Sequence, residues 1–444
     1  MVAGSELVRI TADKLKSLYP KVLERAGGAM RRLALIFALL CLLAPGRADA
    51  SPPKTLFDYV LSSWAVAKAV PSRELKYRQG QLLGYPTDLV DVIYARRGKP
   101  RSIFLVYEKQ GDGDETPFEV GKPFLAPFGL LPQYKYWRDN LPNVPHQQVL
   151  GGKRYVFEGD DIERVAAVVR KFTATFTLTG KKRLAAAAEV VAEALDSPVE
   201  VVAEDAARYL ATKPANLALL GEEGRKRVAS YLTSDRDGEL VASLAEAVGR
   251  AHVESLKPAL EEVAAGHTLK AASALVALEL MGHPRSTEHL IERLDDPSEA
   301  VRSYAARILG TRAAADEKAR DAALRVVVGD DSVSVRSAAA TGLGLSGYKG
   351  AINALGRALE RGDDVAHPAA LALAKFREPK AWRLLEDAVL EGRGEAPAAA
   401  VVALGQAADA CGECARFLRE QRKEHPQKAI RDLIEIVLAV DRRD

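Results

Sequence analysis

The chain has 444 residues, of which 48% are hydrophobic, and this length and composition predict enough apolar surface for two domain cores. Its 63 Lys and Arg residues nearly balance 60 Asp and Glu residues. Residues 1–50 hold eight of the basic and four of the acidic residues, so the remainder has 55 and 56 and a net charge of −1. Binding of phosphates needs a concentrated excess of positive charge. The overall balance therefore indicates no nucleic-acid partner.

A signal peptide is predicted at residues 30–50. Met30 is followed by two arginines, then by the twelve-residue apolar run 33–44, and finally by the tripeptide Ala-Asp-Ala that ends at Ala50. This order is typical of a secretory signal, here cleaved between Ala50 and Ser51. The apolar run is short for a membrane span, which needs about 20 residues. We therefore expect a periplasmic or secreted protein whose mature chain does not span a membrane.

Residues 1–29 precede this signal and are long for such a region. We predict that translation starts at Met30 and that 1–29 is an upstream extension outside the protein. The alternative is a cytoplasmic amphipathic extension.

Residues 51–175 are predicted to form a β-rich domain. Apolar and polar residues alternate over 87–109, which indicates two strands joined by a turn at 97–100. Further strands are expected within 116–128 and 147–159, the latter with a Gly-Gly turn.

The segments of this region that read VDVIYARRG, FEVGKPFLAPF and GGKRYVFEG, in that order, resemble small secreted barrel domains of the OB-like type. The resemblance implies a small antiparallel β-sheet or OB-like barrel. It implies no particular ligand, because such barrels bind many different molecules.

A helical repeat is predicted over residues 181–444. The phrase DDPSEAVRSYAARILG at 295–310 returns as DDSVSVRSAAATGLG at 330–344. In both, aspartates can accept hydrogen bonds from the free N–H groups at a helix start, and Gly310 or Gly344 can close the helix in the left-handed conformation. Each phrase is therefore expected to be one short helix.

The same closing glycine is predicted at Gly249, Gly282 and Gly405, and amphipathic stretches such as 286–294 and 349–360 lie between these helices. Each unit is thus predicted to be a hairpin of a small-residue first helix and an amphipathic second helix. A hairpin of about 33 residues cannot bury its apolar stripe alone, so the pattern is typical of a stacked α-solenoid. We expect the second helices to line its concave wall.

Two aspartate–arginine pairs resemble the repeats of the HEAT-like family, as found in phycobilin lyases and deoxyhypusine hydroxylase. In both pairs the residues are six apart: Asp296 with Arg302, and Asp330 with Arg336. The resemblance implies a structural ladder of hydrogen bonds between units. His367 and Pro397 stand at the arginine place of later units, where the resemblance weakens.

The sequence does not support a catalytic activity like that of deoxyhypusine hydroxylase for this chain. Deoxyhypusine hydroxylase binds iron through His-Glu dipeptides, and this chain contains none, so neither that activity nor any metal or other cofactor is expected. The predicted fold class is α+β by chain, with the small β domain followed by an all-α HEAT-like solenoid.

Cys411 and Cys414 are the two cysteines that remain after removal of the signal. A Cys-x-x-Cys pair at a helix start can be redox active, because a helix N-terminus lowers the thiol pKa. In an oxidising compartment the pair can instead form a structural disulfide or half of a metal site. We favour the disulfide, because redox pairs normally occur in a thioredoxin-like unit.

The solenoid surface is the leading functional feature, because such surfaces usually bind another protein. Arginines of the second helices are the candidate partner contacts, either as a basic stripe for an acidic segment or as part of an ordinary solvated face: Arg320, Arg325, Arg357, Arg361, Arg383, Arg416 and Arg419. The favoured function is an exported, non-catalytic protein-binding scaffold. The alternatives are a periplasmic thiol-disulfide oxidoreductase and a lyase- or hydroxylase-type catalytic HEAT protein.

Overall fold

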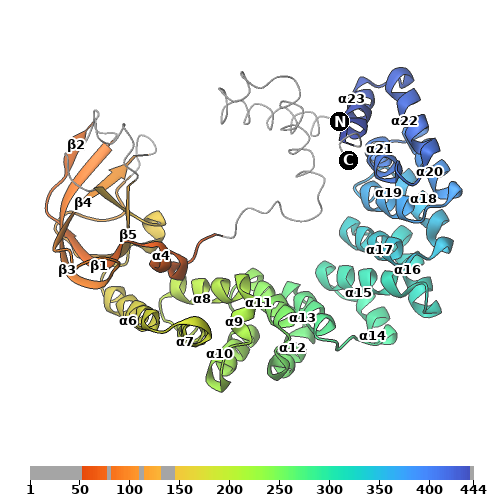
Figure 1. The fold of residues 1–444 in the computed structure, drawn as a ribbon. Helices are drawn as coiled ribbons and strands as arrows, with labels where there is room; N and C mark the ends of the chain where they lie inside the picture. Colours follow the sequence, from red (N-terminus) through yellow and green to blue (C-terminus); the bar gives the residue numbers. More distant parts are fainter. Residues whose placement is uncertain (1–52, 78–81, 110–114, 132–145, 441–444) are drawn as a thin grey trace. The chain divides into compact units, whose positions relative to one another are not determined.

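The structure is a computed structural model, and the residues it describes are 53–77, 82–109, 115–131 and 146–440 (Figure 1). The predicted signal peptide with its cleavage site and the upstream extension 1–29 lie outside the described residues. Contacts divide the chain into two compact units. The N-terminal unit runs from Pro53 to Tyr304, and the C-terminal unit begins at Ala305.

Five strands of the N-terminal unit close into a barrel (Figure 1). They are β1 (Ala65–Pro71), β3 (Leu82–Ala95), β4 (Ser102–Glu108), β5 (Phe124–Leu130) and β6 (His146–Val149). The order around the barrel is β1-β3-β4-β6-β5 and back to β1, with antiparallel neighbours except for the parallel pair β4 and β6. A short strand, β2 (Leu75–Tyr77), pairs with the start of β3. The prediction of a small β-sheet or barrel is confirmed, with one parallel pair among its antiparallel strands.

β3 closes the barrel because it is long enough to serve two neighbours. Its first half pairs with β4 as far as Asp88 and Ser102, and its second half, up to Ala95, pairs with β1. Two register shifts in the β1–β3 ladder bend the strands. The two strands expected within 87–109 are therefore present, but the turn predicted at 97–100 belongs to a wider loop between them.

Alternate side chains of these strands point into the barrel and form one apolar core. Its fully or almost fully buried members include Ala67, Ala69, Leu83, Tyr85, Leu105, Phe124, Ala126 and Phe128. The period of two in a strand sends every second residue to this interior. The core explains why alternation in the sequence predicted strands here.

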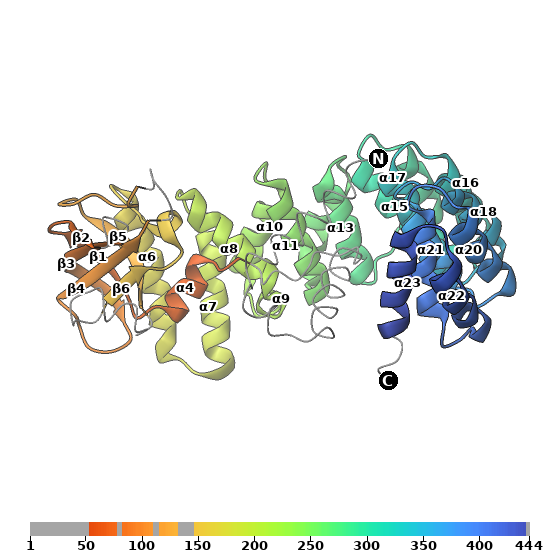
Figure 2. The same cartoon turned by 90° about the horizontal axis from the view of Figure 1, so that it is seen from above.

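The helices of the N-terminal unit, in chain order, are α4 (Leu56–Ser62), α6 (Asp161–Ala174), α7 (Gly180–Ala194), α8 (Glu200–Thr212), α9 (Pro214–Leu217), α10 (Glu222–Thr233), α11 (Gly238–Ala251), α12 (Lys257–Ala264), α13 (Leu269–Leu280) and α14 (Thr287–Glu292). α4 and α6 pack against the barrel (Figure 2). The rings of Phe57 in α4, Phe172 in α6 and Tyr209 in α8 contact one another edge to face. The barrel and the first helices therefore share a core.

Asp205 of α8 ties this joint together. Its side chain is buried and accepts hydrogen bonds from the backbone N–H of Leu56, the hydroxyl of Tyr155 and the guanidinium of Arg154. A buried carboxylate is tolerated only when its oxygens are bonded in this way. Burial and the neighbouring Asp205 charge raise the pKa of Tyr155 far above its usual value. The hydroxyl therefore stays protonated and remains a donor.

The C-terminal unit begins inside α15 (Glu299–Arg312) and contains α16 (Glu317–Gly329), α17 (Val333–Ser346), α18 (Ile352–Glu360), α19 (Ala366–Lys375), α20 (Pro379–Glu391), α21 (Ala396–Ala407), α22 (Gly412–Glu424) and α23 (Lys428–Val440). Two predicted helices, from the phrases at 295–310 and 330–344, correspond to α15 and α17. The prediction of an α-solenoid of helical hairpins is confirmed.

The pairing of helices within a hairpin differs from the prediction. α17, α19 and α21 each pack more on the outer helix that precedes them than on the outer helix that follows, and α23 packs on α22, so the hairpins are α16/α17, α18/α19, α20/α21 and α22/α23. The aspartates of the repeated phrase therefore lie in the turn inside a hairpin. The sequence pattern repeats without marking where a unit begins, which is why the order of the two helices was read in reverse.

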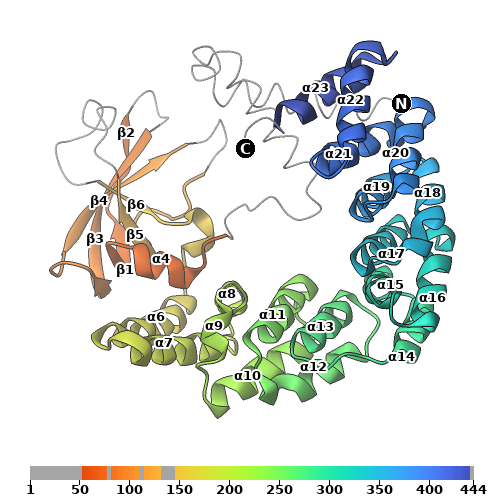
Figure 3. The same ribbon diagram turned by 45° about the vertical axis from the view of Figure 1, so that its right-hand side comes forward.

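Two layers of helices make up the C-terminal unit, an inner layer of α17, α19, α21 and α23 and an outer layer of α16, α18, α20 and α22 (Figures 1 and 3). Neighbours in the inner layer pack closely, whereas neighbours in the outer layer have few contacts. A stack curves towards its more closely spaced layer. The concave side of this unit is therefore formed by the inner layer, and the expectation that the amphipathic helices line it was wrong.

Four of the five predicted closing glycines allow the close spacing of helices and do not close a helix. Gly249, Gly310, Gly344 and Gly405 lie inside helices and do not have the left-handed conformation. A Cβ atom on Gly344 would lie 2.6 Å from the Cβ of Ala372 in the next inner helix. Their function is to let two backbones approach. Only Gly282, with φ +84, has the predicted left-handed conformation among the five.

Candidate functional site

The repeated aspartate–arginine motif forms a bridge between hairpins at Arg336. Its guanidinium donates to the carbonyl oxygens of Asp330 at 2.7 Å and Asp331 at 3.0 Å, and to a carboxylate oxygen of Asp363 at 2.6 Å. The other carboxylate oxygen of Asp363 accepts the N–H of Val365 at the start of the next inner helix. Arg336 therefore holds its own turn and binds the turn of the following hairpin.

The corresponding bridge in the N-terminal unit is centred on Asp296. One carboxylate oxygen accepts the N–H of Ser298 at 2.8 Å, and the other lies 2.8 Å from Nδ1 of His267 and 3.1 Å from Arg293. Burial alone would raise the pKa of Asp296, but the bonds from His267 and Ser298 outweigh burial and lower it. Arg302 donates to the carbonyl oxygen of Asp296 at 2.8 Å. Asp296 therefore stays charged.

A third copy of the motif was missed in the sequence. His425 and Arg431 are six residues apart, in HPQKAIR, as Asp296 and Arg302 are in DPSEAVR. Arg431 donates to the carbonyl of His425, whose Nδ1 accepts the N–H of Gln427 at 3.1 Å. The Nε2 of His425 lies 3.0 Å from the carbonyl oxygen of Val389, so Nε2 carries the proton. A histidine thus replaces the aspartate, and the spacing was the available signal.

The arginines predicted to contact a partner divide into two groups. Arg320 stacks over the ring of Tyr348 and donates to the carbonyl of Ala313, and Arg361 donates to the carbonyl of Val328 and lies 3.6 Å from Asp363. These two are bound to other groups of the fold, although Arg361 is exposed. The other five are exposed on outer-layer helices: Arg325 on α16, Arg357 on α18, Arg383 on α20, and Arg416 and Arg419 on α22.

A hollow of about 340 Å³ opens between α18, α20 and the start of α21. Its lining residues are Gly356, Leu359, Glu360, Leu384, Asp387, Ala388, Glu391, Gly392, Arg393 and Ala396. Three carboxylates and one guanidinium therefore surround two leucine side chains. The hollow is acidic, which the arginine pattern of the sequence did not predict. It forms because outer-layer neighbours are widely spaced.

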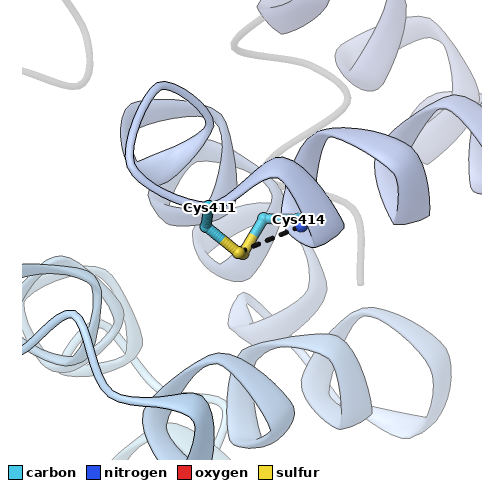
Figure 4. Close-up of a disulfide and its surroundings, with 2 residues drawn as sticks. All are labelled: Cys411 and Cys414. Carbon is cyan, nitrogen blue, oxygen red and sulfur yellow. Dashed lines mark hydrogen bonds between the residues drawn. A yellow bond between two sulfur atoms is a disulfide. The ribbon is translucent and has the colours of Figure 1, made fainter.

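Cys411 and Cys414 lie at the start of α22 (Figure 4). Their sulfur atoms are 1.98 Å apart, the separation of a disulfide, and the Sγ of Cys411 accepts the N–H of Cys414 at 3.0 Å. Both residues are buried, with 3% and 0% of their surface exposed. The sulfur atoms are therefore shielded from any large thiol partner.

Within the described residues, no group of three or more His, Cys, Asp or Glu side chains is arranged to hold a metal ion. Over the same residues, no helix has the length and apolar character needed to cross a bilayer.

Comparison with known proteins places the repeat in a class. A family model described as HEAT repeats matches residues 287–369 and 321–405. The first match begins with α14, and the two together include both predicted aspartate–arginine pairs. Residues 287–405 are therefore HEAT repeats. No curated protein sequence matches the chain.

Two solved structures are similar to parts of the chain. Human deoxyhypusine hydroxylase in complex with glycerol is 16% identical and covers 59% of this chain and 98% of its own, with a TM-score of 0.25. The complex of CpcE and CpcF of phycocyanin lyase from Nostoc sp. PCC7120 is 17% identical and covers 57% and 94%, with a TM-score of 0.28. At these TM-scores neither structure supports an argument about function.

Proposed function

We propose that this protein is an exported, non-catalytic scaffold that binds another protein on the outer layer of its HEAT repeats. The signal-like order of residues 30–50 supports export. The buried charged side chains of the repeat turns are used in bridges such as that of Arg336, which supports a structural role for them.

The hollow between α18 and α20 is the observation that carries the binding proposal. Leu384 provides apolar contact area beside the almost fully buried Leu359, and Glu360, Asp387 and Glu391 provide negative charge. A lysine or arginine side chain of a partner fits this lining, because its methylene groups pack on Leu384 while its charge meets carboxylates. The partner segment is therefore basic, in contrast to the acidic segment of the basic-stripe alternative.

A pair of charge-reversal variants tests this site. Glu360→Lys with Asp387→Lys should abolish capture of the partner in a quantitative cross-linking and pull-down assay on the exported fraction. Arg325→Glu with Arg416→Glu changes as many charges on the same layer but away from the hollow, and this variant should still capture the partner. The reverse result would support the basic-stripe interpretation and contradict an acidic site.

Export is tested independently by the mass of the mature N-terminus. We expect a chain that begins at Ser51 in the periplasm or the medium. Recovery of an intact chain from Met1 in the cytoplasm would contradict export and leave the HEAT assignment unaffected.

A thiol-disulfide oxidoreductase remains the second candidate, because Cys411 lies at the N-terminus of α22, where the helix favours a thiolate. The burial of both cysteines favours a structural disulfide instead. Insulin reduction and dithiol oxidation assays separate the two. Turnover that is lost in a Cys411→Ser, Cys414→Ser variant would establish the enzyme.

A further inference from the structure

A concentrated positive surface lies on the N-terminal unit, far in sequence from the HEAT repeats. We define the basic surface by seven side chains from the β3–β4 loop and the first turn of α7: Arg96, Arg97, Lys99, Arg101, Lys181, Lys182 and Arg183. The first six are exposed and Arg183 is half-buried.

Two aromatic rings connect these segments, although about 80 residues separate them. The ring of Tyr94, at the end of β3, meets the ring of Phe176 edge to face at 5.4 Å between centroids. The guanidinium of Arg183 lies over the same Phe176 ring at 4.7 Å. Arg96 is fixed by a hydrogen bond of 2.8 Å to the carbonyl of Leu61. The loop and the start of α7 therefore form one continuous surface.

The positive charge of this surface is not neutralised within the fold. The sequence has no Asp or Glu from 92 to 107 or from 164 to 188. Cations close by are paired, Arg170 with Asp91 and Lys171 with Glu193, but none of the seven forms an ion pair within the described residues. Three of them also stand at the positive end of the α7 dipole. Such mutual repulsion costs stability unless an external anion lies against it.

Large apolar side chains accompany the cations. Leu178 is 40% exposed and Leu184 is 53% exposed, and they flank the Lys-Lys-Arg turn in a segment that is exposed almost throughout. Surface leucines next to lysines and arginines are the combination that binds the interface of an anionic membrane, with the leucines among the acyl chains and the cations at the headgroups.

We propose that the basic surface docks the N-terminal unit onto a lipid bilayer with anionic headgroups. A nucleic acid would use exposed aromatic rings for stacking, but Tyr94 and Phe176 pack against each other and are only partly exposed. A soluble acidic protein would need apolar residues among its acidic ones to cover both leucines, whereas a bilayer supplies acyl chains beneath its anionic headgroups. The proposal is independent of the scaffold function and of the hollow on the C-terminal unit.

Vesicle co-sedimentation tests the charges. The full protein should bind vesicles of phosphatidylglycerol mixed with phosphatidylcholine more strongly than vesicles of pure phosphatidylcholine. Its binding to the mixed vesicles should weaken as the salt concentration is raised. Lys181→Gln with Lys182→Gln should weaken binding to the mixed vesicles about 25-fold, because each cation near an anionic surface contributes about fivefold. Residues 1–52 are the same in every variant, so any difference reports the basic surface.

A matched control removes the same charge elsewhere. Lys375→Gln with Lys380→Gln changes two exposed lysines of the C-terminal unit and should leave vesicle binding unchanged. An equal loss in both double variants would mean that only net charge matters, which would overturn the proposal.

The leucines distinguish a membrane from other polyanions. Leu178→Ser with Leu184→Ser should weaken vesicle binding at least tenfold through lost apolar burial, with circular dichroism confirming an intact fold. The same variant should bind a short DNA duplex or polyglutamate as the wild type does. Binding of DNA or polyglutamate without binding of anionic vesicles would assign the basic surface to a different partner and refute lipid docking.

Discussion

The inner and outer helix layers of the C-terminal unit differ in what their residues do. The inner layer carries the repeated phrase, and its alanines, glycines and arginines pack helices closely or bridge hairpins. The outer layer repeats less clearly, is richer in charge, and leaves a hollow between α18 and α20. The residues that reveal a repeat in sequence are therefore those that build it, and the binding residues must be sought among those that vary from unit to unit.

The largest expected effect follows from adding a methyl group to the inner layer. A Cβ on Gly342 would lie 2.2 Å from the carbonyl oxygen of Arg307, a backbone atom that cannot move aside. Gly342→Ala should lower the free energy of unfolding by about 3 kcal/mol. Gly329→Ala in the outer layer meets nothing within 4 Å and should not destabilise. Equal denaturant midpoints for the two variants would mean that the layers are not packed differently.

Removal of an inner-layer bridge should have the next largest effect. Arg336→Ala breaks three hydrogen bonds and leaves Asp363 without its cation, which should cost about 2 kcal/mol. Arg325→Ala, on the exposed outer surface, should change stability by less than about 0.5 kcal/mol. Chemical denaturation of both variants measures the difference, and an unchanged midpoint for Arg336→Ala would contradict the bridge.

Loss of the Cys411–Cys414 disulfide should lower the free energy of unfolding less than loss of a disulfide that closes a longer loop. The loop between Cys411 and Cys414 is short, so the expected loss is about 2 kcal/mol or less, against ~3 kcal/mol for a 15-residue loop. The Cys411→Ser, Cys414→Ser variant should melt at a slightly lower temperature and still bind the partner. Thiol trapping of the wild type provides the control, since free thiols would exclude the disulfide.

The smallest effect concerns pH and a histidine of the inner layer. Burial lowers the pKa of His367 below its usual 6.5, against the opposing charges of Glu395 and Asp364. As the pH falls, His367 therefore binds a proton at a higher pH in the unfolded chain than in the folded protein. The stability that neutral His367 contributes is complete above pH 6.5 and decreases as the pH falls below that value. The effect is small because solvent reaches part of the ring. His367→Gln should flatten the dependence of stability on pH between 5 and 7, and an unchanged slope would contradict it.

Local patterns in the sequence predicted local structure well. Alternation indicated β3, β4, β5 and β6 but not β1, and the repeated phrases identified α15 and α17. The barrel closes because β1 pairs with both β3 and β5. Both partners are distant from β1 in the sequence, so no local pattern could predict the closure. Four of the five glycines were assigned the wrong role, because a sequence does not show whether a glycine turns the chain or admits a neighbouring helix.

The two proposed binding surfaces were harder to predict, because they combine residues from separate segments. The near-zero net charge hides the basic surface, which appears only when Tyr94 and Phe176 bring Arg96 and Lys181 to one side. The acidic hollow is likewise assembled from α18, α20 and α21. The spacing of His425 and Arg431 could have been recognised in the sequence, had histidine been accepted in the place of aspartate.

The bonds of Asp205 set a limit on how the protein can be dissected. The predicted division between residues 175 and 181 separates Leu56, Arg154 and Tyr155 from the carboxylate that binds all three. A fragment cut there would expose an apolar surface around Tyr209 and leave a charge without its donors. Experiments on the isolated repeats should therefore begin the chain before α4 or replace Asp205 together with its aromatic neighbours.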